Sequence, residues 1–594
     1  MKEDILHRLE KVRELMDKDC VDVYMVCTND YHMSEYTGDY FNEREFLSGF
    51  TGSAGTLVIT KDTAALFTDG RYFVQAKKQL EGTTIKLMEM GCKGVPELED
   101  YVEAEVPDNG LLGVDGRMVS GVLGMDLKDR LEHKGAHIKC NFNPTEIIWT
   151  DRPAFPSTDV FNAEFGQSSN DKLNKLRDNM KDEYGHIIAT LDDICWLFNI
   201  RGRDVKCNPV VMSYAFITHD DAYIYIDEKR LPQDVKDRFT KEAVKVCPYD
   251  SIYEDINNLG GKKILVDAKR VNLAIYMQLE SAGAVIVERQ NPVVGMKAVK
   301  NDTEIKNLTD VHIDDGAALT EFIYWVKKNV ATGETITEAG AAEYLDGLRA
   351  RIPDFLEPSF DTISAYGANA AMMHYHAGDD SAVLMKEGML LVDSGGQYMR
   401  GTTDVTRTIV LGKLTESQIH HFTLTLKGML RLTKAHFLAG CTGYNLDMLA
   451  RGPLWEEGID YRCGTGHGIG YLLNVHEAPN GFRWKHVIGK NDLCVIEPGM
   501  VTSNEPGVYI EGEYGIRIEN EIIAEKDYEN EYGTWLKFRT LTCAPIDLDA
   551  VDVSILDDRE KAALNEYHAW VRQKLTPYFE GEKLDWLIQA TRNV

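Results

Sequence analysis

Residues 388–410 read GMLLVDSGGQYMRGTTDVTRTIV. Two apolar strand-like segments flank a glycine turn; Asp393 ends the first segment, and the second contains Asp404. A hairpin would bring these two carboxylates together, where they repel each other unless they share a proton or face a cation. The pair therefore indicates either a shared proton or a metal site, although two surface aspartates near a turn would give the same pattern.

A single histidine stands among four glycines in residues 463–470, CGTGHGIG. Glycine lets the backbone approach a ligand closely and leaves the imidazole of His467 unobstructed. The spacing matches neither common glycine-rich phosphate loop, and no lysine follows where phosphate binding would need one. A ligand histidine and a structural histidine in a glycine turn both stay open.

Two further carboxylates lie in strand-like segments nearer the C-terminus. Glu505 ends one such segment, directly before a Pro-Gly turn. In GIRIENEI, which begins at position 515, a period of two places Arg517, Glu519 and Glu521 on one face. A half-exposed strand with solvated charges would give the same alternation.

The N-terminal half contains two similar stretches. Residues 55–71 have the order strand, polar turn, strand, and residues 215–227 repeat it. A helix-like stretch follows each copy, over 72–80 and 232–243. Two related α/β domains in tandem would explain the repetition.

A third region begins near residues 291–297, where a turn-forming Asn-Pro pair precedes a helical pattern over 302–330. The other predicted elements are two helices, 337–350 and 416–439, and two strand-rich stretches, 388–412 and 492–526. This succession predicts an α+β catalytic domain with strands at its centre.

Composition limits the classes of function. A chain of 594 residues is expected to form several domains, and its 44% hydrophobic and 27% charged residues are ordinary for a soluble protein. A formal charge of −30 opposes binding to nucleic acid or to an anionic membrane surface. We find no secretory signal, no run of eighteen apolar residues and, among eleven cysteines, no C-x-x-C pair. These features favour a cytoplasmic protein with reduced thiols.

Several motifs carry a family resemblance. In the C-terminal half they are LVDSGGQY (391–398), GTTDVTRT (401–408), GTGHGIG (464–470), NVHEAP (474–479), SNEPG (503–507) and GIRIEN (515–520). In this order they resemble the metallopeptidase family with the pita-bread fold. FLSGFTGSAGT (46–56) and TDGRYF (68–73) look like the creatinase-type N-terminal domain, and the tail from about Trp535 resembles the C-terminal extension of the long, three-domain Xaa-Pro aminopeptidases.

The resemblance implies a multidomain α/β and α+β fold. Two tandem creatinase-N-like α/β domains would cover residues 1–155 and 156–296. A pita-bread α+β catalytic domain would follow over 297–594, including a C-terminal extension over about 530–594. The resemblance also implies a homodimer.

The resemblance further implies a site for two divalent metal ions. Asp393 would bind one ion, His467 and Glu505 the other, and Asp404 and Glu519 would bridge them. Four carboxylates need such positive charge. An oxygen-rich set with one imidazole suits Mn²⁺, although ligand type alone leaves Zn²⁺, Co²⁺ and Fe²⁺ open.

The implied activity is release of the first residue from peptides whose second residue is proline. A hydroxide that bridges the metal ions would attack the X-Pro amide, and Glu505 would shuttle its proton. His374 and His476 would contact the substrate and stabilise the tetrahedral intermediate or help the leaving group, and Arg517 would line the site. Because X-Pro is a tertiary amide without an N–H, recognition must use the shape of the ring.

Two departures from the family pattern affect specificity. Cys463 stands where long-form relatives can carry histidine, and Val508 stands where an aromatic residue is common. Three other functions stay open: a prolidase that acts on Xaa-Pro dipeptides, a creatinase-like hydrolase without metal, and an inactive peptide- or protein-binding module of the same fold. The last two should lack the ligand set.

Overall fold

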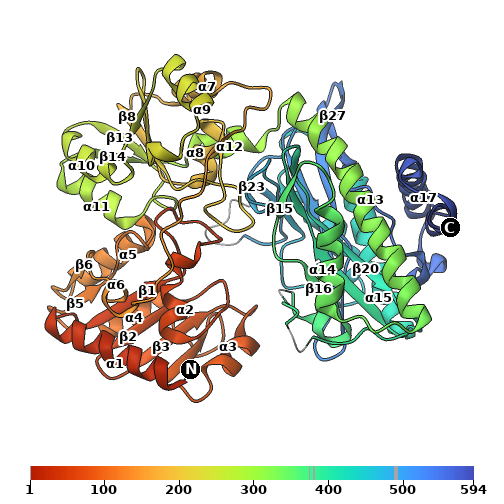
Figure 1. The fold of residues 1–594 in the computed structure, drawn as a ribbon, viewed down its shortest axis with the longest axis horizontal. Helices are drawn as coiled ribbons and strands as arrows, with labels where there is room; N and C mark the ends of the chain where they lie inside the picture. The colour runs from red at the N-terminus through yellow and green to blue at the C-terminus, as the bar shows by residue number, and fades with distance from the viewer. Residues whose placement is uncertain (1, 374, 379–380, 487–492) are drawn as a thin grey trace. The chain divides into compact units, whose positions relative to one another are not determined.

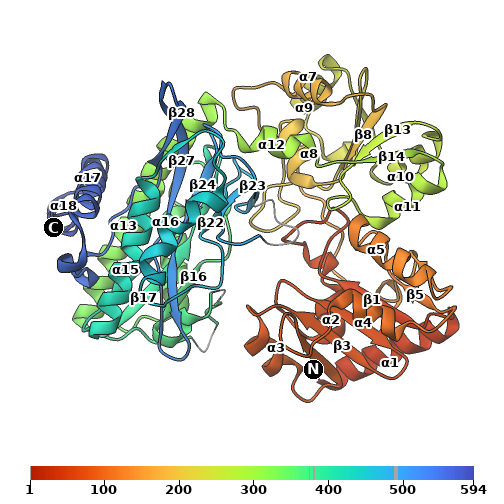
Figure 2. The same ribbon diagram turned by 180° about the vertical axis from the view of Figure 1, so that it is seen from behind.

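The computed structural model describes residues 2–373, 375–378, 381–486 and 493–594. The chain divides into two compact units, Met1–Lys206 with Val210–Val293, and Cys207–Pro209 with Val294–Val594. Each unit is described by itself below (Figures 1 and 2). No helix in the described part of the chain is long and apolar enough to cross a lipid bilayer. All eleven cysteines are free thiols.

The first unit contains two six-stranded sheets of the same topology. Their strand orders are β4-β3-β2-β1-β5-β6 and β12-β11-β10-β8-β13-β14. In both, the three central pairings run antiparallel, antiparallel and parallel in corresponding places, and the outermost pairs are parallel. The strands are β1 Val23–Cys27, β2 Thr56–Thr60, β3 Ala64–Thr68, β4 Ile85–Glu89, β5 Leu111–Gly113, β6 His137–Lys139, β8 Gly185–Ile188, β10 Tyr214–Thr218, β11 Ala222–Tyr225, β12 Val244–Cys247, β13 Lys263–Val266 and β14 Val285–Glu288. The predicted tandem pair of α/β domains is confirmed.

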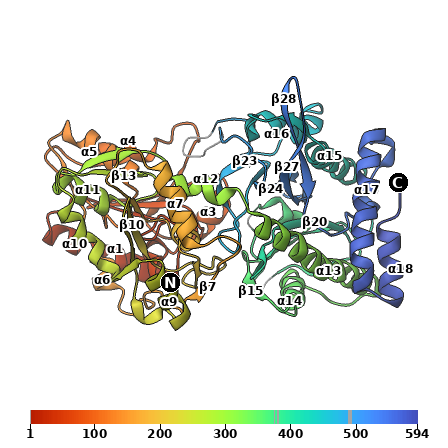
Figure 3. The same ribbon diagram turned by 90° about the horizontal axis from the view of Figure 1, so that it is seen from above.

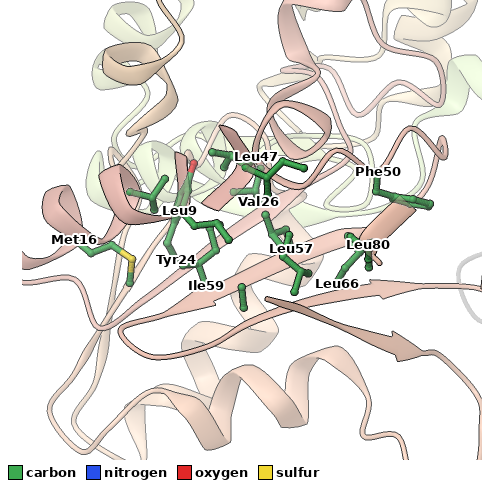
Figure 4. Packing of buried hydrophobic residues seen from close by; sticks show 14 of the residues in the cluster. Leu9, Met16, Tyr24, Val26, Leu47, Phe50, Leu57, Ile59, Leu66 and Leu80 are labelled. Atoms are coloured by element: carbon green, nitrogen blue, oxygen red, sulfur yellow. The ribbon is translucent and has the colours of Figure 1, made fainter. Parts of the chain in front are cut away.

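The helices predicted after each strand pair are also present. They are α3, Phe73–Leu80, and α9, Gln233–Lys241. Helix α1, Lys2–Lys18, covers one face of the first sheet because Ile5, Leu9, Val12 and Met16 recur every three to four residues and are all buried. Figure 4 shows Leu9 and Met16 packed against side chains of β1, β2 and β3.

The first long helix of the second unit is α13, Asp302–Thr332. A capping box of Asn301 and Glu304 starts it, and Gly333, in the left-handed conformation with φ 87°, ends it. Helices α14, Glu338–Arg349, α15, Glu416–Thr433, and α16, Gly443–Trp455, follow along the chain. The central sheet has the order β21-β28-β27-β24-β22-β23, and α15 and α16 lie alongside it (Figures 2 and 3). Its strands are β21 His436–Leu438, β28 Gly533–Thr540, β27 Asn520–Asn530, β24 Val501–Asn504, β22 Gly466–Gly468 and β23 Glu477–Phe482. The predicted α+β domain with central strands is confirmed.

One predicted helix is too long. The pattern over 416–439 predicts a single helix, but α15 ends at Thr433 and residues His436–Leu438 form strand β21. This strand pairs antiparallel with β28, Gly533–Thr540, and buries Phe437. Pairing with a strand a hundred residues away outweighs the local helical periodicity.

Candidate active site

The two aspartates are placed by a β-hairpin. Strand β17, Met389–Ser394, pairs antiparallel with β20, Val405–Val410, so that Asp393 lies opposite Thr406. Asp404 directly precedes β20. The predicted hairpin is therefore present, and its two carboxylates lie at the same end. Its connection contains two short strands, β18, Gly396–Tyr398, and β19, Gly401–Thr402, which the sequence did not indicate.

The glycines around His467 serve strand packing. Strand β22, Gly466–Gly468, lies between β23, Glu477–Phe482, and β24, Val501–Asn504. A Cβ atom on Gly466 would lie 1.9 Å from the carbonyl oxygen of Ser503, and one on Gly468 would lie 2.3 Å from that of Glu477. Larger residues would push the strands apart. These two glycines therefore admit the neighbouring backbones, and their role in admitting a ligand stays a prediction.

The orientation of the His467 ring is fixed by one hydrogen bond. Its Nδ1 lies 3.0 Å from the carbonyl oxygen of Gly468, which only accepts, so Nδ1 carries the proton. The lone pair of Nε2 then faces two carboxylates, at 3.5 Å from Asp404 Oδ2 and 3.4 Å from Glu505 Oε1. The lone pairs of the nitrogen and of the carboxylate oxygens repel one another in this arrangement unless a cation or a proton lies between them.

The remaining carboxylates are joined by a chain of hydrogen bonds. Thr406 Oγ1 donates to Glu519 Oε2 at 2.7 Å and accepts from Arg517 Nε at 3.0 Å. Arg517 Nη2 in turn donates to Asp393 Oδ2 at 2.5 Å. The predicted alternative of solvated charges on a half-exposed strand is wrong, because Arg517, Glu519 and Glu521 are all buried.

Burial and the neighbouring negative charges raise the pKa values of two carboxyl groups at the site. Burial raises the pKa of the Asp404 carboxyl well above its ordinary value, and the charges of Asp393, Glu505 and Glu521 raise it further. Burial likewise raises the pKa of Glu519, with Asp404 and Glu505 adding to the effect. The protein alone therefore holds these carboxylates ionised at a cost in free energy, which bound cations would remove.

The residues fit divalent cations. One ligand atom each from Asp404, His467 and Glu519 lies within 4.8 Å of the others. Asp393 Oδ1 and Glu519 Oε1 are buried and have no hydrogen-bond partner among the described residues. Each such orphaned acceptor costs about 1–3 kcal/mol. Bound cations would satisfy both oxygens and the Nε2 lone pair of His467.

The other predicted site residues differ in their placement. The ring of His476 lies 4.3 Å from that of His467, centroid to centroid, in a T-shaped arrangement. Arg517 is bound by Asp393, Thr406 and the hydroxyl of Tyr509, so its guanidinium contacts a predicted ligand; contact with substrate stays a prediction. His374 lies outside the described residues.

Supporting residues at the site were missed from the sequence. Ser503 Oγ accepts from the His467 amide at 3.0 Å and donates to Glu505 Oε1 at 2.9 Å. Glu521 Oε1 accepts from the Asp404 amide at 2.7 Å. Ser503 stands in a motif already singled out, and Glu521 in the alternating segment, but their roles depend on contacts across the sheet that local sequence does not encode.

The predicted specificity positions pack together. Val508, on β25, Gly507–Ile510, is fully buried in a small apolar cluster against which Cys463 also packs. Burial raises the pKa of the Cys463 thiol to about 11, and the nearby charge of Glu505 adds to the effect. Cys463 is therefore an uncharged thiol near neutral pH.

Family models match most of the chain. Residues 8–143 and 151–304 each match the creatinase/prolidase N-terminal domain, residues 306–526 match metallopeptidase family M24, and residues 534–594 match the C-terminal region of peptidase M24.

Full-length relatives agree with these matches. The chain is 38% identical to a probable Xaa-Pro aminopeptidase P of Laccaria bicolor over 98% of this chain and 92% of that one, and 39% identical to one of Pyricularia oryzae over 98% of each. Its fold matches the crystal structure of X-prolyl aminopeptidase from Caenorhabditis elegans, described as a cytosolic enzyme with a di-nuclear active site, with a TM-score of 0.92, 32% identity, and coverage of 99% of this chain and 100% of that one. The resemblance found in the motifs is confirmed. The chain belongs to the metallopeptidase family M24, among the members named Xaa-Pro aminopeptidase P.

Proposed function

We propose that this protein is a metal-dependent aminopeptidase that releases the first residue from peptides with proline in second position. The observation that carries the proposal is the cluster of Asp404, His467 and Glu519, together with one oxygen each of Asp393 and Glu519 that finds no hydrogen-bond partner in the described part of the chain. It lies in a chain 32% identical over nearly its full length to an X-prolyl aminopeptidase with a di-nuclear site.

Five residues would hold two divalent ions: Asp393, Asp404, His467, Glu505 and Glu519. When bound, such ions polarise the carbonyl of the scissile amide and make water acidic enough to attack it near neutral pH. The protein contributes the fixed orientation of His467 and the buried hydrogen bonds that hold the carboxylates. This rigidity keeps the cost of reorganisation low.

The proton transfers would fall to the protein's own side chains. The side chain of Glu505 is 20% exposed, more than those of the other carboxylates at the site, so it can accept a proton from the attacking water and pass it to the proline nitrogen. His476, beside His467, would donate a hydrogen bond to the developing oxyanion. Arg517 would offset the charge of Asp393.

A substrate comparison tests the proposed activity. The chelated protein should leave Xaa-Pro-Xaa tripeptides intact, and Mn²⁺ should restore release of the first residue, with kcat/KM much lower for Xaa-Pro dipeptides. We propose Mn²⁺ as the native metal because oxygen ligands dominate the set, so Mn²⁺ should restore a higher kcat/KM than Zn²⁺, Co²⁺ or Fe²⁺.

Three results would contradict this proposal in different ways. Hydrolysis of dipeptides alone would indicate a prolidase. Turnover that survives chelation would indicate a hydrolase without metal. Peptide binding without turnover under any metal would indicate a binding module.

We also propose a cytoplasmic homodimer. Free cysteines and the cytosolic relative support the location, which cell fractionation tests. Exposed apolar side chains of Tyr444, Met448 and Leu449 on α16 support self-association, because water-exposed clusters of this kind often mark interfaces. Light scattering coupled to size exclusion should give twice the 67.0 kDa chain mass, and Met448→Glu should shift it toward the monomer. A monomeric wild-type protein would refute the dimer.

A further inference from the structure

The first residues of the C-terminal region are buried in the interior of the catalytic unit. After β28, residues 541–546 pass against α13, where a Cβ atom on Gly316 would lie only 1.9 Å from the carbonyl oxygen of Cys543. Cys543 and Ala544 are fully buried. Two helices follow, α17, Asp558–Leu575, and α18, Gly581–Ala590, seen beside α13 in Figures 1 and 3. The region is therefore packed into the domain and does not hang from it.

The buried guanidinium of Arg407 joins this region to the candidate metal site. Arg407 lies on β20, is 1% exposed, and donates to six acceptors. Three belong to the catalytic core: the carbonyl oxygens of Thr406 and Glu519, at 2.9 and 2.5 Å, and Asn520 Oδ1 at 2.8 Å. Three belong to the C-terminal region: the carbonyl oxygens of Pro545 and Ala544, at 3.0 and 2.9 Å, and the hydroxyl of Tyr567 at 2.9 Å.

From these contacts we infer that the C-terminal region is part of the metal site, and that Tyr567 is a positioning residue which acts through Arg407 on the backbone of Glu519. The inference rests on the proposed function, which makes Glu519 a metal ligand.

The hydroxyl of Tyr567 makes two hydrogen bonds that bear on Arg407. It accepts from Arg407 Nη2 and donates to the carbonyl oxygen of Ala544 at 2.7 Å, so it fixes both the guanidinium and another acceptor of that guanidinium. Arg407 in turn holds the Glu519 carbonyl, while the Glu519 side chain binds Thr406. Metal ligands must lie within about 0.2 Å of their ideal distances, so a small shift of this backbone weakens metal binding.

A pair of matched variants tests the inference. Tyr567→Phe removes the hydroxyl that contacts Arg407. Tyr578→Phe is the control, because it removes another hydroxyl of the same region. This hydroxyl donates to Asp314 Oδ1 of the catalytic core at 2.5 Å, and its hydrogen bond does not involve Arg407. Both are prepared free of metal and titrated with Mn²⁺ by calorimetry, and their thermal midpoints are measured without metal.

We expect Tyr567→Phe to weaken Mn²⁺ binding about tenfold, the lower end of the range for outer partners of metal ligands, and Tyr578→Phe to bind as the wild type does. Arg407→Lys, which cannot reach six acceptors, should weaken binding further if it folds. Unchanged affinity in Tyr567→Phe, or equal weakening in both tyrosine variants, would overturn the inference. A wild-type protein that binds no Mn²⁺ would instead refute the proposed metal site.

Discussion

Asp404→Asn is expected to lower kcat/KM for an Xaa-Pro-Xaa tripeptide by about 10³–10⁴, because it removes a proposed bridging ligand and the several kcal/mol of transition-state stabilisation that bound metal supplies. The same substitution should stabilise the metal-free protein. Asp404 is buried among other carboxylates and faces the Nε2 lone pair of His467, to which an asparagine amide could donate. A loss of activity together with a gain in stability would show that the buried carboxylates destabilise the metal-free protein and are kept for metal binding.

A second buried aspartate provides the control. Asp204, in the other unit, is paired with Arg230 at 2.6 Å and also accepts from Thr158 Oγ1. Asp204→Asn should therefore lose stability and keep the Mn²⁺ affinity of the wild type. Calorimetric unfolding of the metal-free proteins measures stability, titration with Mn²⁺ measures affinity, and kinetics at saturating Mn²⁺ measure kcat/KM. Full activity in Asp404→Asn, or a lower thermal midpoint of its metal-free form, would contradict the expectation.

Glu477→Gln is expected to cost about 3–5 kcal/mol in the stability of the catalytic unit, because it breaks a buried ion cluster. Glu477 lies between two buried lysines, with Oε2 3.0 Å from Lys297 Nζ and Oε1 2.5 Å from Lys300 Nζ. The neutral amide would remove the carboxylate charge that both buried ammonium groups contact. Since His476 is the preceding residue, kcat/KM should fall as well.

The same substitution at a half-exposed pair separates burial from charge. Glu525 lies 2.6 Å from Arg539 Nε, and both side chains are 35% exposed. Glu525→Gln should cost less than about 1 kcal/mol. Replacing Glu477, Lys297 and Lys300 together by Leu, Met and Met should recover most of the lost stability. Equal losses at Glu477 and Glu525 in calorimetric unfolding would show that the buried cluster does not behave as a unit.

The fold could be predicted where local pattern and packing agree. The two strand-turn-strand stretches gave the tandem domains because antiparallel neighbours in sequence, such as β2 and β3, are also neighbours in the sheet. Strands of three or four residues, such as β5 and β6, could not be predicted, because a segment this short does not show a hydrophobic period. The sequence of strand β21 continues the helical period of α15, and local pattern does not encode a pairing with a partner about a hundred residues away.

The candidate site divides in the same way. Its five proposed ligands were named from motifs, and the structure brings Asp404, His467 and Glu519 together. The spacing could not show that Arg517 and Glu519 are buried, since alternation in a strand is the same for a covered and a solvated face. Nor could it reveal Arg407, whose acceptors are spread over more than a hundred residues of chain.

The distance in sequence between Arg407 and its C-terminal acceptors also sets when their hydrogen bonds can form during protein synthesis. Arg407 and Tyr567 are 160 positions apart, and a ribosome adds about 5–20 residues per second, so roughly 10–30 s pass between the two. During that interval the nascent β20 has no C-terminal acceptors for its guanidinium. The newborn chain therefore completes the hydrogen bonds around its proposed metal site only when translation is nearly finished.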